Sequence, residues 1–290
     1  DFARCDGWWG NHYSTASNTA AWLAYDTRWT APSWIDSSVR IAGGSIQSPA
    51  ANTSPITLSG ITIPYDRVRV IYTRTPNGGT LTVASASGGS GAIATAGATA
   101  SMEQTVSVTR GIGNLTLTPA ASTAGIFLIA IEIWDSTVGQ VIVRDMSYSG
   151  ATAVSFGQTS GAAALLTADF ASYCFTLNDA AVGAKDAALF STELQALIGV
   201  YSAGGGAVSL FVENESSAAW NVNSTPEKQR TFAAAIRALG ASANYPVIDL
   251  PARWGDYATA NASGLMYNDP HPNYAGHYDK ALLLANAAWA

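Results

Sequence analysis

The stretch Asn268-Asp269-Pro270-His271-Pro272-Asn273-Tyr274-Ala275-Gly276-His277 lies between a polar loop and a helical tail near the end of the chain. In that tail, apolar residues recur at helical spacing, at Tyr278, Ala281, Leu282, Ala285 and Trp289. Pro272 fixes φ at a helix start, where its missing N–H costs nothing. The pattern therefore predicts that His271 sits on a short, rigid loop just ahead of the last helix.

An imidazole in such a place can act as a general base near neutral pH, if a neighbouring acceptor fixes its tautomer. Two residues can supply that acceptor: Asp269 lies two positions before His271, and Asn268 lies three before it. We expect Asp269, because only a carboxylate stabilises the imidazolium that forms during acyl transfer, and we keep Asn268 as the alternative. The other interpretation of His271 is a loop histidine that caps the helix or bonds a backbone carbonyl.

His-Pro-Asn followed by a glycine at the start of the last helix resembles the final block of the SGNH (GDSL-like) hydrolases. In that family an Asp-x-x-His pair serves a serine nucleophile, and Asn268 occupies the position of the aspartate. The Gly-Asp-Ser block of the family is matched by Cys5-Asp6-Gly7, ahead of a helical segment at 17–25. The resemblance thus implies that Gly7, which has no side chain, stands at the nucleophile position.

Asp36-Ser37 offers a rival nucleophile, Ser37, with a glycine downstream. The segment before it contains Pro32, which makes a poor first strand of a sheet. We therefore prefer the placement at Gly7. Without a catalytic role, Asp36-Ser37 is a loop or helix-cap pair.

Two further stretches resemble the blocks that form the oxyanion hole in this family. Ser149-Gly150-Ala151 resembles the second block, in which a glycine N–H is a donor, and Thr176-Leu177-Asn178-Asp179 resembles the third, in which the asparagine is a donor. Fixed donors stabilise the negative charge that develops on a carbonyl oxygen, and loss of one raises the barrier by roughly 3 kcal/mol. The alternatives are a plain turn at Gly150 and an Asx-turn at Asn178.

Residues 43–144 have few charges and contain short alternating runs rich in Val, Ile and Thr. These runs predict strands at 56–63, 67–73, 80–84, 105–109, 115–118 and 126–134. Pro76-Asn77-Gly78-Gly79 predicts a hairpin turn between two of them. Short strands with regular turn signals are typical of a β-sandwich or jelly roll, and the segment shows no reaction centre.

After residue 144, strand-like runs at 171–177, 207–212 and 246–250 alternate with helical ones at 186–197, 227–239 and 274–288. Such alternation predicts a parallel sheet with helices on both faces, and ligands bind at the carboxyl ends of its strands. We expect this sheet to be built from residues 1–10 and 141–290.

The predicted fold is an SGNH-like three-layer α/β domain, formed by 1–42 and 145–290, with an inserted all-β, jelly-roll-like domain at 43–144. Similar arrangements occur in cell-wall O-acetylesterases and phage-tail SGNH proteins. The resemblance implies an ester hydrolase that removes O-acyl groups from a polysaccharide or cell-wall glycan, without metal or cofactor. Gly7 leaves two alternatives: a catalytically inactive carbohydrate-binding or phage-tail attachment module, or a serine replaced to trap substrate.

Composition limits the other classes of function. The chain of 290 residues is 48% hydrophobic and 12% charged, so it can bury a large core. Its formal charge of −6, with 14 Lys and Arg, argues against nucleic acid or an anionic membrane as partner. The longest apolar runs, such as Ala124–Trp134, are too short to insert into a membrane.

Abundant small residues and nine Trp suggest an extracellular or virion-surface protein that handles sugars. Cys5 and Cys174 can pair or remain free thiols; Cys174 lies in an apolar strand-like run, which favours a buried, inert thiol. The sequence leaves the oligomeric state open.

Overall fold

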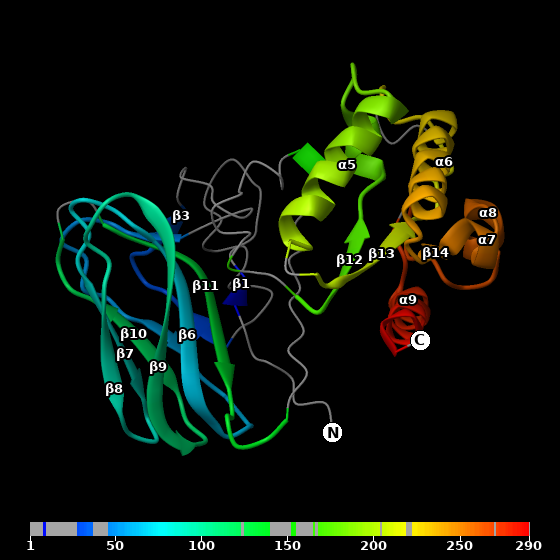
Figure 1. Cartoon of the computed structure of the whole chain (residues 1–290). Helices are drawn as coiled ribbons and strands as arrows, with labels where there is room; N and C mark the ends of the chain where they lie inside the picture. The colour runs from blue at the N-terminus through cyan, green and yellow to red at the C-terminus, as the bar shows by residue number, and fades with distance from the viewer. Residues whose placement is uncertain are drawn as a thin grey trace. The chain divides into compact units, whose positions relative to one another are not determined.

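The computed structural model describes residues 8–9, 28–36, 46–122, 125–139, 152–154, 165, 168–203, 205–218, 222–269 and 271–289. The chain forms two compact units, Asp1–Ser149 with Gln158–Leu165, and Gly150–Gly157 with Leu166–Ala290. The described antiparallel strands belong to the first unit and the parallel strands to the second (Figure 1).

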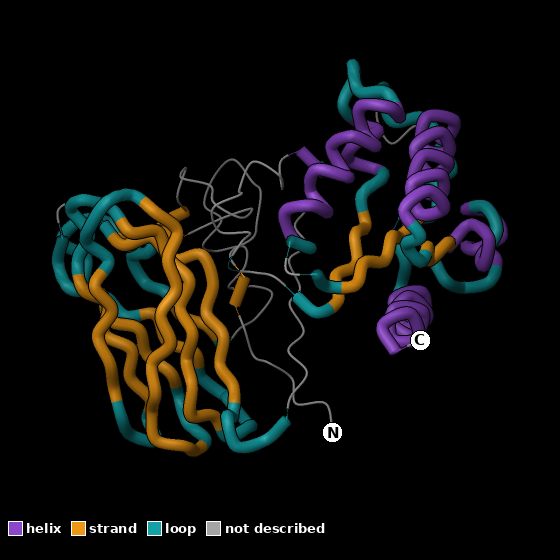
Figure 2. Tube along the Cα trace, viewed as in Figure 1, coloured by secondary structure: helices purple, strands orange, loops and turns teal. Residues whose placement is uncertain are grey.

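The first unit contains two antiparallel sheets around one hydrophobic core (Figure 2). The six-stranded sheet has the order β3 (Ile35–Asp36), β4 (Ile46–Ser48), β11 (Ile126–Trp134), β6 (Tyr65–Arg74), β9 (Ala100–Gly111), with β1 (Trp8–Trp9) also paired to β11. The five-stranded sheet has the order β2 (Trp29–Thr30), β5 (Ile56–Leu58), β10 (Leu115–Pro119), β7 (Thr80–Ser85), β8 (Ser90–Ala94). Side chains of both sheets, including Val70 and Leu128 from one and Leu58 and Leu81 from the other, share one buried cluster.

The strands follow from the patterns of their residues. In β7, Leu81 and Val83 are buried while Thr80 and Thr82 are exposed, as expected for a strand with one face on a core. In β11 every residue from Ile126 to Ile133 is buried, because this strand lies between β4 and β6 in the middle of its sheet. The six predicted runs are confirmed as β5, β6, β7, β9, β10 and β11.

The predicted hairpin at Pro76–Gly79 is wrong. A tight turn is present, since the Gly78 N–H donates to the Thr75 carbonyl at 3.1 Å. However, β6 before the turn and β7 after it belong to different sheets, so the chain crosses from one sheet to the other. A Cβ at Gly78 would lie 2.1 Å from the Thr95 carbonyl oxygen, so the crossing requires glycine there. Both strands thereby direct their apolar faces into the same core.

Part of the predicted N-terminal arrangement also needs correction. Of residues 1–10, expected in the parallel sheet, the structure describes Trp8 and Trp9, and these pair with Ile131 and Ala130 of β11. Strands β2 and β3, which lie within the predicted segment 1–42, likewise join the antiparallel sheets. The predicted helix at 17–25 lies outside the described residues.

The second unit has a three-stranded parallel sheet in the order β12 (Phe170–Cys174), β13 (Ala207–Val212), β14 (Val247–Asp249). Its helices are α4 (Leu177–Ala181), α5 (Ala187–Tyr201), α6 (Pro226–Ala243), α7 (Leu250–Trp254), α8 (Tyr257–Ala262) and α9 (Tyr274–Trp289). Helices α5 and α6 lie on one side of the sheet and α9 on the other (Figure 1). The predicted alternation of strands and helices in this region is confirmed.

Local chemistry sets the bounds of these helices. Asp186 caps α5 by accepting the Leu189 N–H at 2.8 Å, and Thr225 caps α6 ahead of Pro226 by accepting the Lys228 N–H at 3.2 Å. Helix α6 ends at Asn244, whose left-handed conformation (φ 56°) stops the helix. Phe190 of α5 stacks on Phe232 of α6 with ring centroids 4.8 Å apart, which joins the two helices.

Candidate functional site

The loop that carries His271 is held at both of its ends. The Tyr267 N–H donates to the His271 carbonyl at 2.9 Å, and Met266 and Pro272 form a β-bridge. The Asn273 side chain accepts the Gly276 N–H at 3.1 Å at the start of α9 and donates to the Gly264 carbonyl at 2.8 Å. His271 is therefore presented on a short closed loop directly ahead of a helix, as the sequence predicted.

Gly276 is part of that construction. A Cβ at this position would lie 2.3 Å from the Leu265 carbonyl oxygen and 2.9 Å from the ring of Pro272. Glycine thus lets the first turn of α9 approach the segment that leads into the loop. This is the physical reason for the Pro-Asn-x-x-Gly spacing after His271.

The partner of the His271 ring is Asn268. Its side-chain oxygen lies 2.7 Å from His271 Nδ1, and the imidazole is exposed. With Nδ1–H donated to this oxygen, Nε2 carries the lone pair that a general base needs. The structure therefore favours Asn268, the alternative, over Asp269 as the residue that orients the ring.

Asp269 has a different position from the one we expected. Its two carboxylate oxygens each accept the Ser217 N–H at 2.9 Å, and the Ser217 hydroxyl also donates to it. Ser217 belongs to the loop that follows β13, so Asp269 ties the His271 loop to the carboxyl end of the sheet. Asp269 points toward this loop because two donors there match its acceptors better than the single Nδ1–H, which Asn268 already binds.

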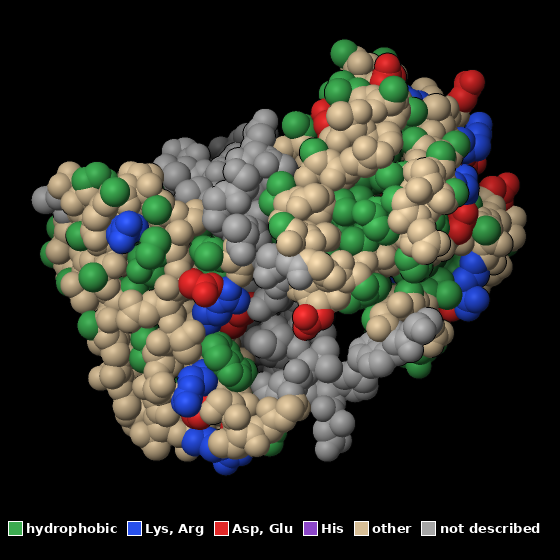
Figure 3. Space-filling view, in the orientation of Figure 1, with side chains coloured by type: hydrophobic (Ala, Val, Ile, Leu, Met, Phe, Trp, Pro, Cys, Tyr) green, Lys and Arg blue, Asp and Glu red, His purple; other side chains and the backbone are tan. Residues whose placement is uncertain are grey.

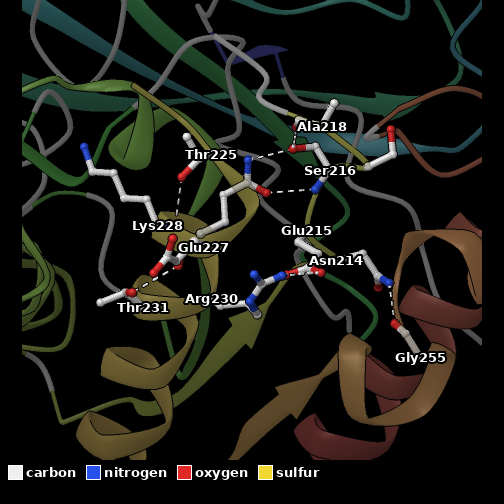
Figure 4. A network of polar contacts seen from close by, with 12 residues as sticks. Asn214, Glu215, Ser216, Ala218, Thr225, Glu227, Lys228, Arg230, Thr231 and Gly255 are labelled. Carbon is white, nitrogen blue, oxygen red and sulfur yellow. Dashed lines mark hydrogen bonds and ion pairs between the residues drawn. The ribbon is translucent and has the colours of Figure 1, made fainter. Parts of the chain in front are cut away.

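A buried glutamine supports the loop after β13. Gln229 of α6 is 1% exposed, accepts the Ser216 N–H at 2.8 Å and donates to the Ser216 hydroxyl at 2.8 Å. Asn214 donates to the Gly255 carbonyl at 2.9 Å, and Ser216 donates to the Ala218 carbonyl at 2.6 Å (Figure 4). The hydrogen bonds thus run from α6 through Ser216 and Ser217 to the His271 loop.

Ser216, Ser217 and Gln229 were not among the residues predicted from the sequence. The available signal was Asn214-Glu215-Ser216-Ser217 at the end of a predicted strand, the edge where parallel sheets bind ligands. His277 on α9 was not predicted as a site residue either. Desolvation and the nearby Lys280 ammonium lower the pKa of this histidine.

The other described site residue, Asn178, follows β12 near the start of α4 and is partly exposed. The next residue, Asp179, is fully buried and accepts the Ala153 N–H at 3.2 Å from each carboxylate oxygen. Ala153 comes three positions after Gly150 in the chain. The structure therefore brings together the Asn178 turn and the segment that follows Gly150.

Asp179 is paired with a buried cation. Lys185 is 4% exposed and its ammonium lies 2.7 Å from the Asp179 carboxylate; it also pairs with Glu193. Burial opposes the charge on Lys185, but its hydrogen bonds to the two carboxylates raise its pKa above the usual value. The segment with Asn178 thus rests on a buried ion pair, unlike the exposed pairs on the surface of this unit.

We expect Lys185→Met to lower the free energy of unfolding by about 3–5 kcal/mol, because it leaves the Asp179 carboxylate buried without its cation. Arg230→Met is the matched control: Arg230 pairs with Glu215 at 2.8 Å but is largely exposed, so its loss should cost less than about 1 kcal/mol. Urea denaturation measures both. Equal losses would show that the Lys185 pair does not stabilise this region.

Opposite charges alternate on the second unit. Arg237 pairs with Asp249, and Arg253 pairs with Asp279, each at 2.6 Å. Figure 3 shows basic and acidic side chains side by side over α6 and the short helices beside it. This face of the unit offers no basic stripe for a polyanion.

Gly7, Ser37, Gly150 and Cys5 lie outside the described residues. Cys174 is a free thiol at the end of β12. Its surface is exposed, where we expected burial. Desolvation and the nearby Glu213 carboxylate nevertheless raise the pKa of the thiol well above its usual value, as expected for an inert thiol.

The described residues contain no group of three or more His, Cys, Asp or Glu arranged to hold a metal ion. Within the same residues, no helix has both the length and the apolar character needed to cross a bilayer.

The fold is similar to that of a solved esterase structure. A peptidoglycan O-acetylesterase structure is 15% identical, with a TM-score of 0.67 over 97% of this chain and 81% of that one. The YxiM protein of Bacillus subtilis is 17% identical, with a TM-score of 0.46 over 91% of this chain and 90% of that one. An acetyl xylan esterase is 18% identical, with a TM-score of 0.40 over 51% of this chain and 79% of that one. No protein-family model matches the sequence, and no curated protein does. The first structure shows that this chain has the mixed α/β fold of a peptidoglycan O-acetylesterase.

Proposed function

We propose that the protein is a carboxylic ester hydrolase of the SGNH type that removes O-acyl groups, acetyl in particular, from a polysaccharide. The observation that carries this proposal is the His271–Asn268 pair, held at the carboxyl edge of a parallel sheet in a chain with this fold. Peptidoglycan and acetyl xylan, the substrates in the names of the similar structures, supply the substrate class. An extracellular or virion-surface location fits such a substrate.

In this proposal His271 Nε2 takes the proton of the nucleophile and later returns it to the leaving alcohol. Asn268 holds the tautomer, while Asp269 positions the loop through Ser217. Asn178 and the Gly150 N–H are the oxyanion donors. Residue 7 is the nucleophile position and Ser37 its rival; no metal or cofactor takes part.

We also propose that the antiparallel sheets are an insertion in the α/β domain, because residues 5–7 precede their first strand, β1, in sequence and Gly150 follows their last strand, β11. The three short strands β1, β2 and β3 then belong to the insertion and not to the α/β domain. A jelly-roll-like body in this position would present loops to the glycan.

The second candidate function is a glycan-binding or attachment module without catalysis. Gly7 at the nucleophile position favours it, since glycine has no side chain to attack an ester. The two candidates share the same binding surface and differ in turnover.

Acetate release tests the proposal. The unchanged chain and its Gly7→Ser variant are incubated with p-nitrophenyl acetate, acetylated xylan and O-acetylated peptidoglycan, and free acetate is measured. Release from at least one polysaccharide is expected. If neither form releases acetate from any of the three, the esterase proposal is wrong and the binding module remains.

Asn268→Asp is expected to raise kcat/KM for p-nitrophenyl acetate by about tenfold, measured in the Gly7→Ser background. A charged acceptor 2.7 Å from Nδ1 stabilises the imidazolium by about 1–2 kcal/mol more than a neutral amide does. Asn261→Asp, at an exposed position of α8, adds the same charge away from the loop and should change kcat/KM little. If Asp269→Ala removes activity while Asn268→Asp has no effect, Asp269 is the orienting residue.

A further inference from the structure

In the part of the chain that the structure describes, three exposed tyrosine rings lie around His271. Among the described residues whose exposure the structure gives, the exposed aromatic side chains are Tyr267 (78%), Tyr274 (86%) and Tyr278 (59%). All three lie between residues 267 and 278, on either side of the candidate base. Aromatic rings left in solvent side by side mark a surface that binds a partner or a ligand.

The backbone places these rings at the candidate site. Tyr267 is joined to His271 across the loop by its N–H bond to the His271 carbonyl, at 2.9 Å. Tyr274 is the first residue of α9, and Tyr278 follows one turn later on the same side of that helix. The rings therefore extend from the His271 loop along the first turns of α9.

A groove continues this surface. It has a volume of about 460 Å³ and lies between α7 and α9, lined by Arg253, Leu265, Ala275, Tyr278, Asp279 and Leu282 among others. Tyr278 thus belongs both to the row of exposed rings and to the wall of the groove. The two features form one continuous surface within the second unit.

The charges in the groove neutralise each other. The Arg253 guanidinium donates to both oxygens of Asp279, each at 2.6 Å, and the Trp254 indole N–H donates to the same carboxylate at 2.8 Å. A phosphate polymer or anionic lipid would need an unpaired cation here. The groove instead combines ring faces and aliphatic carbons with polar groups that can bond hydroxyls.

We propose that Tyr274, Tyr278 and the groove beside α7 bind a neutral pyranose residue of the glycan that carries the ester. A pyranose has an apolar C–H face that stacks on a tyrosine ring and hydroxyls at its rim that bond Arg253 and Asp279. This inference rests on the proposed function for its substrate class. It adds the position of a sugar subsite, next to His271 and extending along α9.

Binding of neutral oligosaccharides tests the subsite without requiring hydrolysis. Xylohexaose and N-acetylated chitohexaose are titrated into the full chain by calorimetry. We expect at least one to bind, and expect Tyr274→Ala and Tyr278→Ala each to raise its Kd by about tenfold. Tyr278→Phe keeps the ring and should change Kd by less than about threefold. Leu189→Ala removes an exposed apolar side chain from α5, 47% exposed, and should leave Kd unchanged.

Several outcomes overturn the inference. The first is that neither sugar binds, and the second is that the tyrosine variants bind sugar as tightly as the unchanged chain does. The third is that the unchanged chain self-associates in sedimentation and that Tyr278→Ala abolishes this association without affecting sugar binding. The proposed esterase fails separately. If the chain binds sugar through these tyrosines but never releases acetate, the subsite is supported and the esterase proposal is wrong. If the chain releases acetate and the tyrosine variants have an unchanged Kd, the esterase is supported and the subsite is wrong.

Discussion

Placing a serine at position 7 is expected to raise p-nitrophenyl acetate hydrolysis by about 10³-fold or more over the unchanged chain. Oxyanion donors and a positioned histidine without a nucleophile still give roughly 10³-fold catalysis over water, whereas a complete constellation reaches far beyond that. Gly7→Ser adds the missing hydroxyl at the position that matches the Gly-Asp-Ser block. Initial rates of p-nitrophenol release measure the gain.

Gly139→Ser is the matched control for this substitution. Nothing lies within 4 Å of a Cβ at Gly139, so a serine there fits without adding a nucleophile to the site. It should leave the rate unchanged. If Gly7→Ser also has no effect, and Ser37→Ala abolishes activity in the unchanged chain, Ser37 is the nucleophile and the block assignment at Cys5-Asp6-Gly7 is wrong.

His271→Ala is expected to lower kcat/KM of the Gly7→Ser protein by about 10³-fold, back toward the value of the unchanged chain. A general base contributes about 10²–10⁴ in rate, and residues that act as a unit lose nearly the whole effect when one is removed. Because the His271 side chain is exposed and the loop is held by the backbone of His271, the variant should fold normally. Thermal unfolding checks this.

His277→Ala is the control for His271→Ala. It tests whether activity depends on His271 itself or is lost when any histidine near the site is removed. His277 lies on α9, six positions after His271 in sequence, and is exposed. Its removal should change kcat/KM by less than about threefold. A larger loss in His277→Ala than in His271→Ala would transfer the role of base to His277.

The fold similarity and the candidate site are two separate observations. The similarity, at 15% identity, concerns the arrangement of the chain, whereas the site is defined by Asn268, His271 and the contacts of Asp269. The carboxylate of Asp269, which we expected to orient the ring because it can stabilise an imidazolium, instead holds the loop through Ser217. The protein therefore orients its candidate base with a neutral amide, and the predicted gain from Asn268→Asp follows from this.

The local elements follow from patterns that can be read in the sequence. Alternation of apolar and polar residues predicted the strands around residues 67–73 and 126–134, and helical spacing predicted α6 and α9. Pro272 and Gly276 predicted the loop that presents His271. Such features depend on residues within a few positions of each other, and their patterns are visible without knowledge of the fold.

The way in which those elements pack together depends on contacts between residues far apart in the sequence. Pro76–Gly79 joins two sheets because the strands on either side share a core, and nothing in the turn sequence distinguishes that crossing from a hairpin. Asp269 binds Ser217, which lies 52 positions away in the sequence. Asn268 binds the ring of His271, which lies three positions away. The choice between two adjacent acceptors depends on which donors the rest of the chain places beside them. Periodicity carries no information about contacts at that separation, so the partner of His271 became evident only in the folded protein.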